Sequence, residues 1–139
     1  MEKLIEKLNL KDLHRICIIN PEPDIISAIH SARPTLDIDT SIDPRYLYNF
    51  FLAFVSSPSQ VEDLTPGAVH NLYEDGILWY AYPRITKEEA FPFSKEKGWD
   101  ILKTLGFKAV RQITINEDWN GIRFRNSRFV RNRISSREN

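Results

Sequence analysis

The sequence predicts an α/β protein built on a doubly wound, mostly parallel sheet of five or six strands. Short apolar runs typical of buried strands alternate with segments of helical apolar spacing, which indicates parallel strands joined by crossover helices. An Asn120-Gly121 pair between the last two apolar runs predicts a tight hairpin, and therefore an antiparallel C-terminal pair. With 139 residues, we expect one Rossmann-like domain over residues 1–132 and a flexible arginine-rich tail over 133–139.

The first elements are marked by apolar spacing and by prolines. Apolar residues at helical spacing predict an opening helix over residues 2–8. The run RICIIN over residues 15–20 is followed by Pro-Glu-Pro, which is typical of a buried parallel strand and its end. Pro23 suits the first turn of a helix that reaches about residue 31. Alternating apolar and polar residues predict a second strand over residues 35–39.

The middle of the chain predicts a buried strand and a capped helix. Residues 46–56 are strongly apolar and form the third expected strand. Ser57 is the expected cap of the next helix, with a proline at its first position and Gln60 three residues after the cap. We expect Pro66 to interrupt or restart this helix, and Gly76 to close the turn beyond it.

The last third predicts a strand, a helix and two returning strands. Residues 77–82 form the fourth expected strand, and Ser94 is the expected cap of a helix that Gly106 ends. Three apolar residues are expected on the inner face of this helix: Trp99, Leu102 and Leu105. Strands over residues 108–115 and 122–129 then complete the sheet.

The composition indicates a soluble globular protein. Apolar residues make up 42% of the chain, and the longest mainly apolar run, residues 46–55, is about half the length of a membrane span. The N-terminus lacks the continuous apolar stretch of a signal peptide. The single cysteine, Cys17, excludes an internal disulfide and is interpreted as a core residue. We therefore expect a cytoplasmic protein without membrane contact.

Charge is unevenly distributed along the chain. Residues 1–83 carry 6 basic and 12 acidic side chains, whereas residues 84–139 carry 13 basic and 7 acidic ones. Six arginines lie in the last seventeen positions: Arg123, Arg125, Arg128, Arg131, Arg133 and Arg137. This asymmetry is compatible with an acidic partner or nucleic acid. We favour the alternative that the tail packs across the acidic half of its own chain or stays solvated.

Several segments resemble the class I methyltransferase fold from residue 15 almost to the end. They are the acidic end of the second strand, the strand RYLYNFFLAF, the helix WDILKTLGF, and a Glu-Asp-Gly turn similar to the family's Leu-x-Pro-Gly-Gly turn. A strand–helix unit is missing between Asp39 and Tyr46. The family's glycine-rich cofactor loop is replaced by Asn-Pro-Glu-Pro-Asp over residues 20–24, whose prolines remove donors and whose carboxylates occupy the helix N-terminus. We therefore expect neither methyl transfer nor a bound cofactor.

A second resemblance covers most of the chain. The segments NPE, LW-x-x-YP-[RK] and W-x-x-[IL]-RFR resemble a family of small bacterial proteins of unknown function. Members of that family end in Trp-Ser-Ala-Leu-Arg-Phe-Arg, whereas this chain has Trp-Asn-Gly-Ile-Arg-Phe-Arg over residues 119–125. The resemblance implies the same fold and a bacterial, cytoplasmic origin, but no reaction.

Candidate ligand-binding residues lie at the carboxyl edge of the predicted sheet, where open α/β sheets bind ligands. They are Asn20, Glu22, Asp39, Ser57, Tyr82 and Arg84, with Arg123 and Arg125 on the returning strand. Asp39 occupies the place of a ribose-binding acid, although a turn or capping role is favoured. Arg84 begins a loop with Lys87, Glu88 and Glu89 that is long enough to serve as a lid or to be an ordinary solvated loop. The two arginines could hold an anion together, but we favour pairing with Glu117, Asp118 or an acid from the N-terminal half.

Three functions remain open after these observations. The leading hypothesis is a non-enzymatic or degenerate domain that binds a small molecule or protein at the carboxyl edge. The alternative is a diverged transferase-type enzyme that uses Asp39 and the Arg84 loop. The third and least supported is nucleic-acid binding through the C-terminal arginines, so we do not expect a nucleic-acid partner. No metal site is expected, because the three histidines and one cysteine have no ligand spacing.

Overall fold

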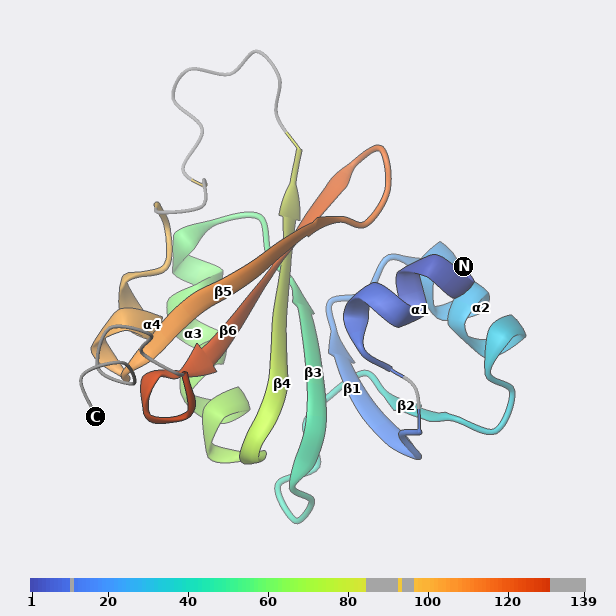
Figure 1. Cartoon of the computed structure of the whole chain (residues 1–139), viewed down its shortest axis with the longest axis horizontal. Coiled ribbons are helices and arrows are strands. Elements are labelled where there is room, and N and C mark those ends of the chain that lie inside the picture. The colour runs from blue at the N-terminus through green and yellow to red at the C-terminus, as the bar shows by residue number, and fades with distance from the viewer. Residues whose placement is uncertain (11, 85–92, 94–96, 131–139) are drawn as a thin grey trace, which may run out of the picture.

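The computed structural model of the chain describes residues 1–10, 12–84, 93 and 97–130. It contains one six-stranded sheet with the order β2-β1-β3-β4-β6-β5 (Figure 1). The strands are β1 (Arg15–Ile19), β2 (Asp37–Asp39), β3 (Tyr48–Phe54), β4 (Leu72–Pro83), β5 (Phe107–Thr114) and β6 (Trp119–Asn126). The first four are parallel, and β6 runs antiparallel to both β4 and β5. The predicted fold class is confirmed.

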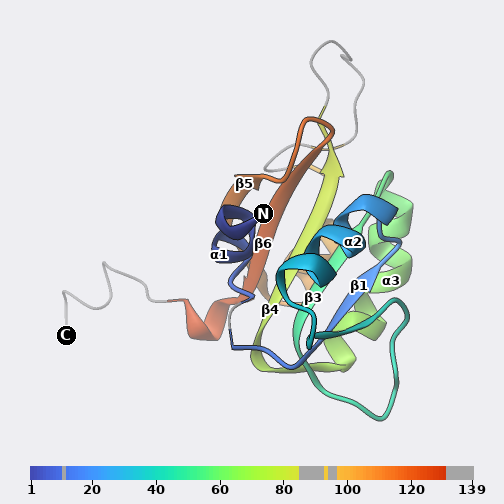
Figure 2. The same cartoon turned by 90° about the vertical axis from the view of Figure 1, so that its right-hand side faces the viewer.

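Helices cover both faces of the sheet, as Figure 2 shows from the side. The helices are α1 (Glu2–Leu8), α2 (Pro23–Ala32), α3 (Pro58–His70) and α4 (Asp100–Thr104), and a 3₁₀ turn follows β6 over Ser127–Phe129. Apolar side chains of α1 and α2 pack on one face of the sheet, and those of α3 and α4 on the other. No helix of the described residues is long and apolar enough to cross a membrane.

The expected cap of α3 forms, but Pro66 does not interrupt the helix. Ser57 Oγ accepts from the backbone N–H of Gln60 at 3.3 Å, and Gln60 Oε1 accepts from the backbone N–H of Ser56 at 2.5 Å. The helix continues through Pro66 to His70, contrary to the prediction. Beside the proline, the buried Thr65 hydroxyl lies 2.5 Å from the Tyr80 hydroxyl. This contact holds α3 against β4 directly before the proline, whose missing N–H removes one hydrogen bond of the helix.

Two glycines predicted in turns lie inside strands instead. Gly76 lies within β4, which begins earlier than predicted and has a register shift where Asp75 adopts a φ of 55°. Gly121 lies in β6, opposite Ala81 and Ile113. A Cβ at Gly121 would lie 3.0 Å from Ile113 Cγ1, so close packing explains the glycine. The hairpin turn falls earlier, at Asn116, whose Oδ1 accepts from two backbone N–H groups.

Other expectations concern the C-terminal helix and the core. Trp99 and Leu102 are fully buried, as predicted for the inner face of this helix. Leu105 is not, because it follows the last helical residue, Thr104, and is 40% exposed. Gly106 follows with a φ of 87°, as expected for a helix stop. Cys17 is fully buried, and burial raises the pKa of its thiol to about 12. Ser94, the loop residues Lys87, Glu88 and Glu89, and the tail over 133–139 lie outside the described residues.

Alanine should have opposite effects at two glycines of the structure. A Cβ at Gly76 would lie 2.7 Å from Leu72 Cδ1 and 2.9 Å from the Tyr73 carbonyl oxygen, whereas at the helical Gly67 its nearest contact is 3.5 Å. We expect Gly76→Ala to lower the free energy of unfolding by about 1–3 kcal/mol. Gly67→Ala should raise it by up to about 1 kcal/mol. Urea denaturation of both variants measures this, and equal effects would contradict the close approach.

Candidate functional site

The turn after β1 has the position that receives ligands in Rossmann-like folds. Asn20 adopts a left-handed conformation with a φ of 53°, and its Nδ2 donates to the carbonyl oxygen of Phe54 at 3.4 Å. Glu22 then occupies the cap position of α2, but its side chain makes no capping hydrogen bond. Glu22 Oε1 is buried and has no hydrogen-bond partner among the described residues. A buried carboxylate oxygen in this state calls for a donor.

Asp39, the expected ribose-binding acid, is bonded within its own chain. Arg15 Nε donates to Asp39 Oδ2 at 2.9 Å, and Arg15 Nη2 lies 2.7 Å from the same oxygen. The Tyr48 hydroxyl also donates to this oxygen. Burial and the nearby Asp39 carboxylate raise the pKa of Tyr48 to about 12, so the donor stays protonated. The charge of the Asp39 carboxylate is therefore paired with Arg15 of β1, and Arg15 and Tyr48 of β3 together fix its orientation.

This network extends to the connection between β2 and β3. Arg15 Nη2 lies 3.2 Å from Asp43 Oδ2, and the Arg15 guanidinium stacks 4.2 Å from the centre of the Tyr46 ring. Asn71 Nδ2 donates to the carbonyl oxygens of Asp43 and Tyr46. The three charged residues that line the open hollow of about 400 Å³ here, Arg15, Asp39 and Asp43, therefore already pair with one another.

The remaining residues of the carboxyl edge also contact their own chain. Ser57 caps α3. Tyr82 is buried between Phe93 and Trp99, its hydroxyl accepts from Gln112 Nε2 at 3.0 Å, and burial raises its pKa. Arg84 donates from its backbone N–H to the Asp118 carbonyl at 2.9 Å and from Nη1 to the Asn116 carbonyl at 3.1 Å. Arg84 thus holds the β5–β6 turn.

Arg123 and Arg125 share one face of β6, as the alternation predicted, but lie away from the carboxyl-edge residues. Arg125 makes a bidentate pair with Asp75 through Nε at 2.8 Å and Nη2 at 2.6 Å. Of the expected partners, the structure shows an acid of the N-terminal half and not Glu117 or Asp118. Arg123 Nε is buried and has no hydrogen-bond partner in the described part of the chain.

Sequence reasoning missed Arg15, Asp75 and Arg111 as members of polar clusters. Arg15 begins a buried strand and was read as part of an apolar run. Asp75 was read as a turn residue, and its left-handed conformation inside β4 places it against Arg125. Arg111 lies opposite Arg123 only because β5 contains a register shift. Among the described residues, no three His, Cys, Asp or Glu side chains are grouped as a metal site.

The geometry defines a Rossmann-like α/β domain, and solved structures with a similar fold agree with this class. The chain is similar to the pyocyanin biosynthetic protein PhzM, with a TM-score of 0.59 and 12% identity over 88% of this chain and 54% of that one. It is also similar to a SAM dependent methyltransferase from Aquifex aeolicus, with a TM-score of 0.52 and 9% identity over 90% and 88% of the two chains.

A third similar structure is fibrillarin from Aeropyrum pernix, solved with natively bound S-adenosyl-L-methionine. Its TM-score is 0.51, with 12% identity over 88% of this chain and 73% of that one. No family model matches the sequence. No curated protein matches it significantly. These likenesses show the fold.

The residues of this chain do not fit S-adenosylmethionine in the manner the fold suggests. Pro21 and Pro23 have no backbone N–H to offer in the turn after β1. Asp39 Oδ2 is bonded to Arg15 and Tyr48, which leaves Oδ1 as the oxygen that could accept from a ribose hydroxyl. Glu22 Oε1, which has no partner among the described residues, is a further acceptor that a ligand at this edge could use.

Proposed function

We propose that this chain is a diverged transferase-type domain that binds a small molecule bearing hydrogen-bond donors beside Glu22, at the carboxyl edge of its sheet. The unpartnered, buried Oε1 of Glu22 carries the proposal. Glu22 lies two residues after the left-handed Asn20, where the chain turns from β1 into α2. A ligand hydroxyl or ammonium group would supply the missing donor, and a charged donor would also satisfy the carboxylate electrostatically.

The likeness of the fold to a SAM dependent methyltransferase supports the transferase-type alternative over a purely structural role. The same fold places ligands at the switch point between strands that lead in opposite directions, here β1 and β3. Glu22 adjoins this switch point. The proposed ligand therefore occupies the usual position of the fold while contacting a different set of residues.

Binding can be tested by calorimetry with three probes: adenosine, S-adenosylhomocysteine and putrescine. We expect at least one to bind, and we expect Glu22→Gln to weaken that binding roughly tenfold to a hundredfold. Asp24→Asn is the matched control, because Asp24 is an exposed carboxylate at the same helix terminus. Absence of binding by all three probes, or equal loss in both variants, would contradict the proposed site.

A second candidate is a binding domain without catalysis. It is favoured by the internal hydrogen bonds of Asp39, Ser57 and Arg84, which leave these side chains committed to the fold. A turnover assay separates the two candidates. With putrescine present as the acceptor, formation of N-methylputrescine and S-adenosylhomocysteine in equal amounts above the buffer rate supports the transferase, whereas ligand binding without turnover supports the binding domain.

A further inference from the structure

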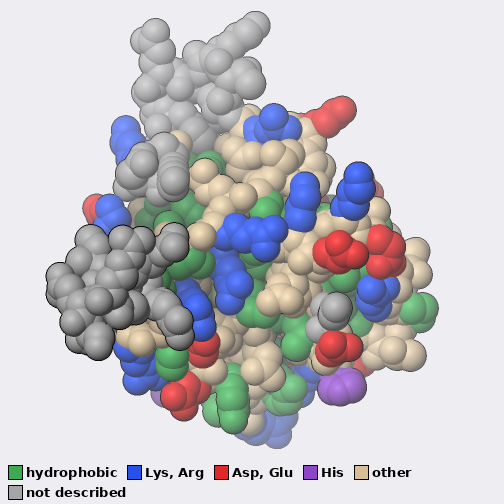
Figure 3. Space-filling model, in the orientation of Figure 1, with side chains coloured by type: hydrophobic (Ala, Val, Ile, Leu, Met, Phe, Trp, Pro, Cys, Tyr) green, Lys and Arg blue, Asp and Glu red, His purple; other side chains and the backbone are tan. Residues whose placement is uncertain are grey.

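One face of the β5–β6 pair carries a band of basic side chains, seen in the middle of Figure 3. Lys108 of β5 lies opposite Arg125 of β6, and Arg111 lies opposite Arg123. Opposite residues of an antiparallel pair point to the same face, so all four side chains share it. With Arg128 of the turn after β6, they form what we call the basic face.

A bulge in β5 creates this alignment. Lys108 and Arg111 are three residues apart, and in a regular strand they would point to opposite faces. The register of β5 shifts between Ala109 and Arg111, with Val110 as the additional residue. The shift brings Arg111 to the same side as Lys108. Both basic side chains of the edge strand β5 therefore lie on the same face of the sheet as Arg123 and Arg125.

The basic side chains of this face outnumber the carboxylate that pairs with them, Asp75. The pKa of Asp75 is lowered by its hydrogen bonds to Arg125 and further by the charges of Arg123 and Arg128. The pKa of Arg123 is lowered by burial and by repulsion from Arg125 and Arg111. The Asp75 carboxylate thus interacts with three guanidinium groups, and Arg123 is repelled by a further one, that of Arg111. A bound anion would relieve this repulsion.

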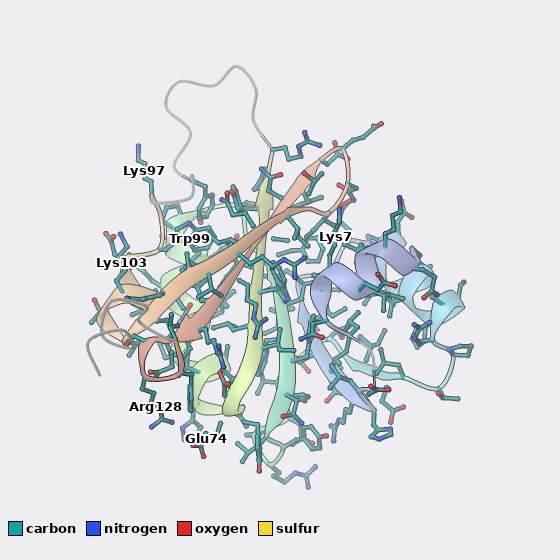
Figure 4. All side chains as sticks on the ribbon, viewed as in Figure 1. Lys7, Glu74, Lys97, Trp99, Lys103 and Arg128 are labelled. Atoms are coloured by element: carbon teal, nitrogen blue, oxygen red, sulfur yellow. The ribbon has the colours of Figure 1, made fainter. Side chains whose placement is uncertain are left out.

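The basic face is open to a ligand along its length. Lys108, Arg111 and Arg128 are exposed, and no helix of the described residues lies over the centre of the β5–β6 pair (Figures 1 and 2). At one end, Lys7 of α1 lines an open hollow of about 420 Å³ with Arg111. At the other end, Figure 4 shows Arg128 near Glu74, and these two described residues form no ion pair. The surface suits an extended polyanion better than an enclosed small anion.

We propose that the basic face binds the phosphate backbone of single-stranded nucleic acid. Guanidinium groups match the geometry of phosphate, and the exposed Lys108, Arg111 and Arg128 offer cations that a flexible phosphate backbone could follow. Arginine is also common at the centre of protein interfaces, so an acidic protein is the competing occupant, and the test below separates it from nucleic acid. This inference goes beyond the carboxyl-edge site and does not depend on it.

Fluorescence anisotropy with a labelled oligouridylate of about twelve nucleotides tests the proposal. We expect binding that weakens steeply with salt between about 50 and 200 mM KCl, with a slope of log Kd against log salt of about 3 for four phosphate contacts. The double variant Arg111→Gln/Arg128→Gln should bind roughly tenfold or more weakly, and its slope should fall by about 1.4.

The matched control is Arg33→Gln/Arg45→Gln, which removes the same charge from side chains paired with Glu2 and Asp43 away from the basic face. Its affinity and slope should stay within about twofold of the unmodified protein. No binding at low salt, or equal weakening in both double variants, would overturn the proposal. Binding of labelled polyglutamate as tightly as oligouridylate would also overturn it, in favour of an acidic protein partner. Circular dichroism checks that every variant is folded.

Discussion

Replacing Trp79 by alanine is expected to lower the free energy of unfolding by about 3–5 kcal/mol. Trp79 is fully buried at the centre of β4, and its Nε1 donates to the carbonyl oxygen of Leu8 at 3.0 Å. The indole therefore fills the core beneath α1 and also satisfies a carbonyl at the end of that helix. Urea denaturation followed by circular dichroism would measure the loss.

The variant Trp79→Phe separates the two contributions. It keeps an aromatic ring but leaves the Leu8 carbonyl without its donor, which should cost about 1–3 kcal/mol. We also expect faster amide hydrogen exchange in α1 (residues 2–8) than in β3, because the helix loses its polar attachment to the sheet. If exchange in α1 were unchanged, the hydrogen bond would have no role in holding the helix.

Replacing Asp75 by asparagine is expected to lower the free energy of unfolding at pH 7 by about 1–2 kcal/mol. The exposure of the pair, with side chains 30% and 36% accessible, keeps the effect modest. The variant loses the bidentate acceptor of Arg125 and leaves the arginines of the basic face without their carboxylate. Glu74→Gln is the control, since Glu74 is an exposed neighbour of Asp75 and should change stability little.

The effect of Asp75→Asn should depend on pH in a defined direction. The pKa of Asp75 is lower in the folded protein than its ordinary value, so its stabilising contribution is present above that ordinary value. It is lost as pH falls through the lower, folded value. The difference between the protein and the variant should therefore be full near pH 7 and shrink below about pH 4. A difference that grows toward acid would show that the pair is not the cause.

The order of elements could be predicted from the sequence because apolar spacing and proline positions determine it locally. Helices α1 and α2 begin where expected, and the cap at Ser57 forms. The predictions at Pro66, Gly76 and Gly121 were wrong for a shared reason. Proline and glycine were expected to end a helix or form a turn at these positions, whereas tertiary contacts with the sheet decide the local conformation.

The candidate site was harder to predict, because the hydrogen bonds of its side chains are made with residues that are distant in sequence. The position of Asp39 at the end of β2 followed from the pattern, but its bonds to Arg15 and Tyr48 required the register of three strands. The unpartnered oxygen of Glu22 likewise leaves no signal in composition or spacing. The predictions for ligand binding at these residues stay open to the calorimetric test.

The additional residue in β5 has a consequence for how this surface can change by mutation. On most strands, the charge of a face changes only when one residue type replaces another. Deleting Val110 would leave every lysine and arginine in the chain, yet it would turn Lys108 and Arg111 to opposite sides of the sheet. Among homologous chains, a one-residue deletion in this strand would therefore alter the electrostatic character of the surface without altering net charge or isoelectric point.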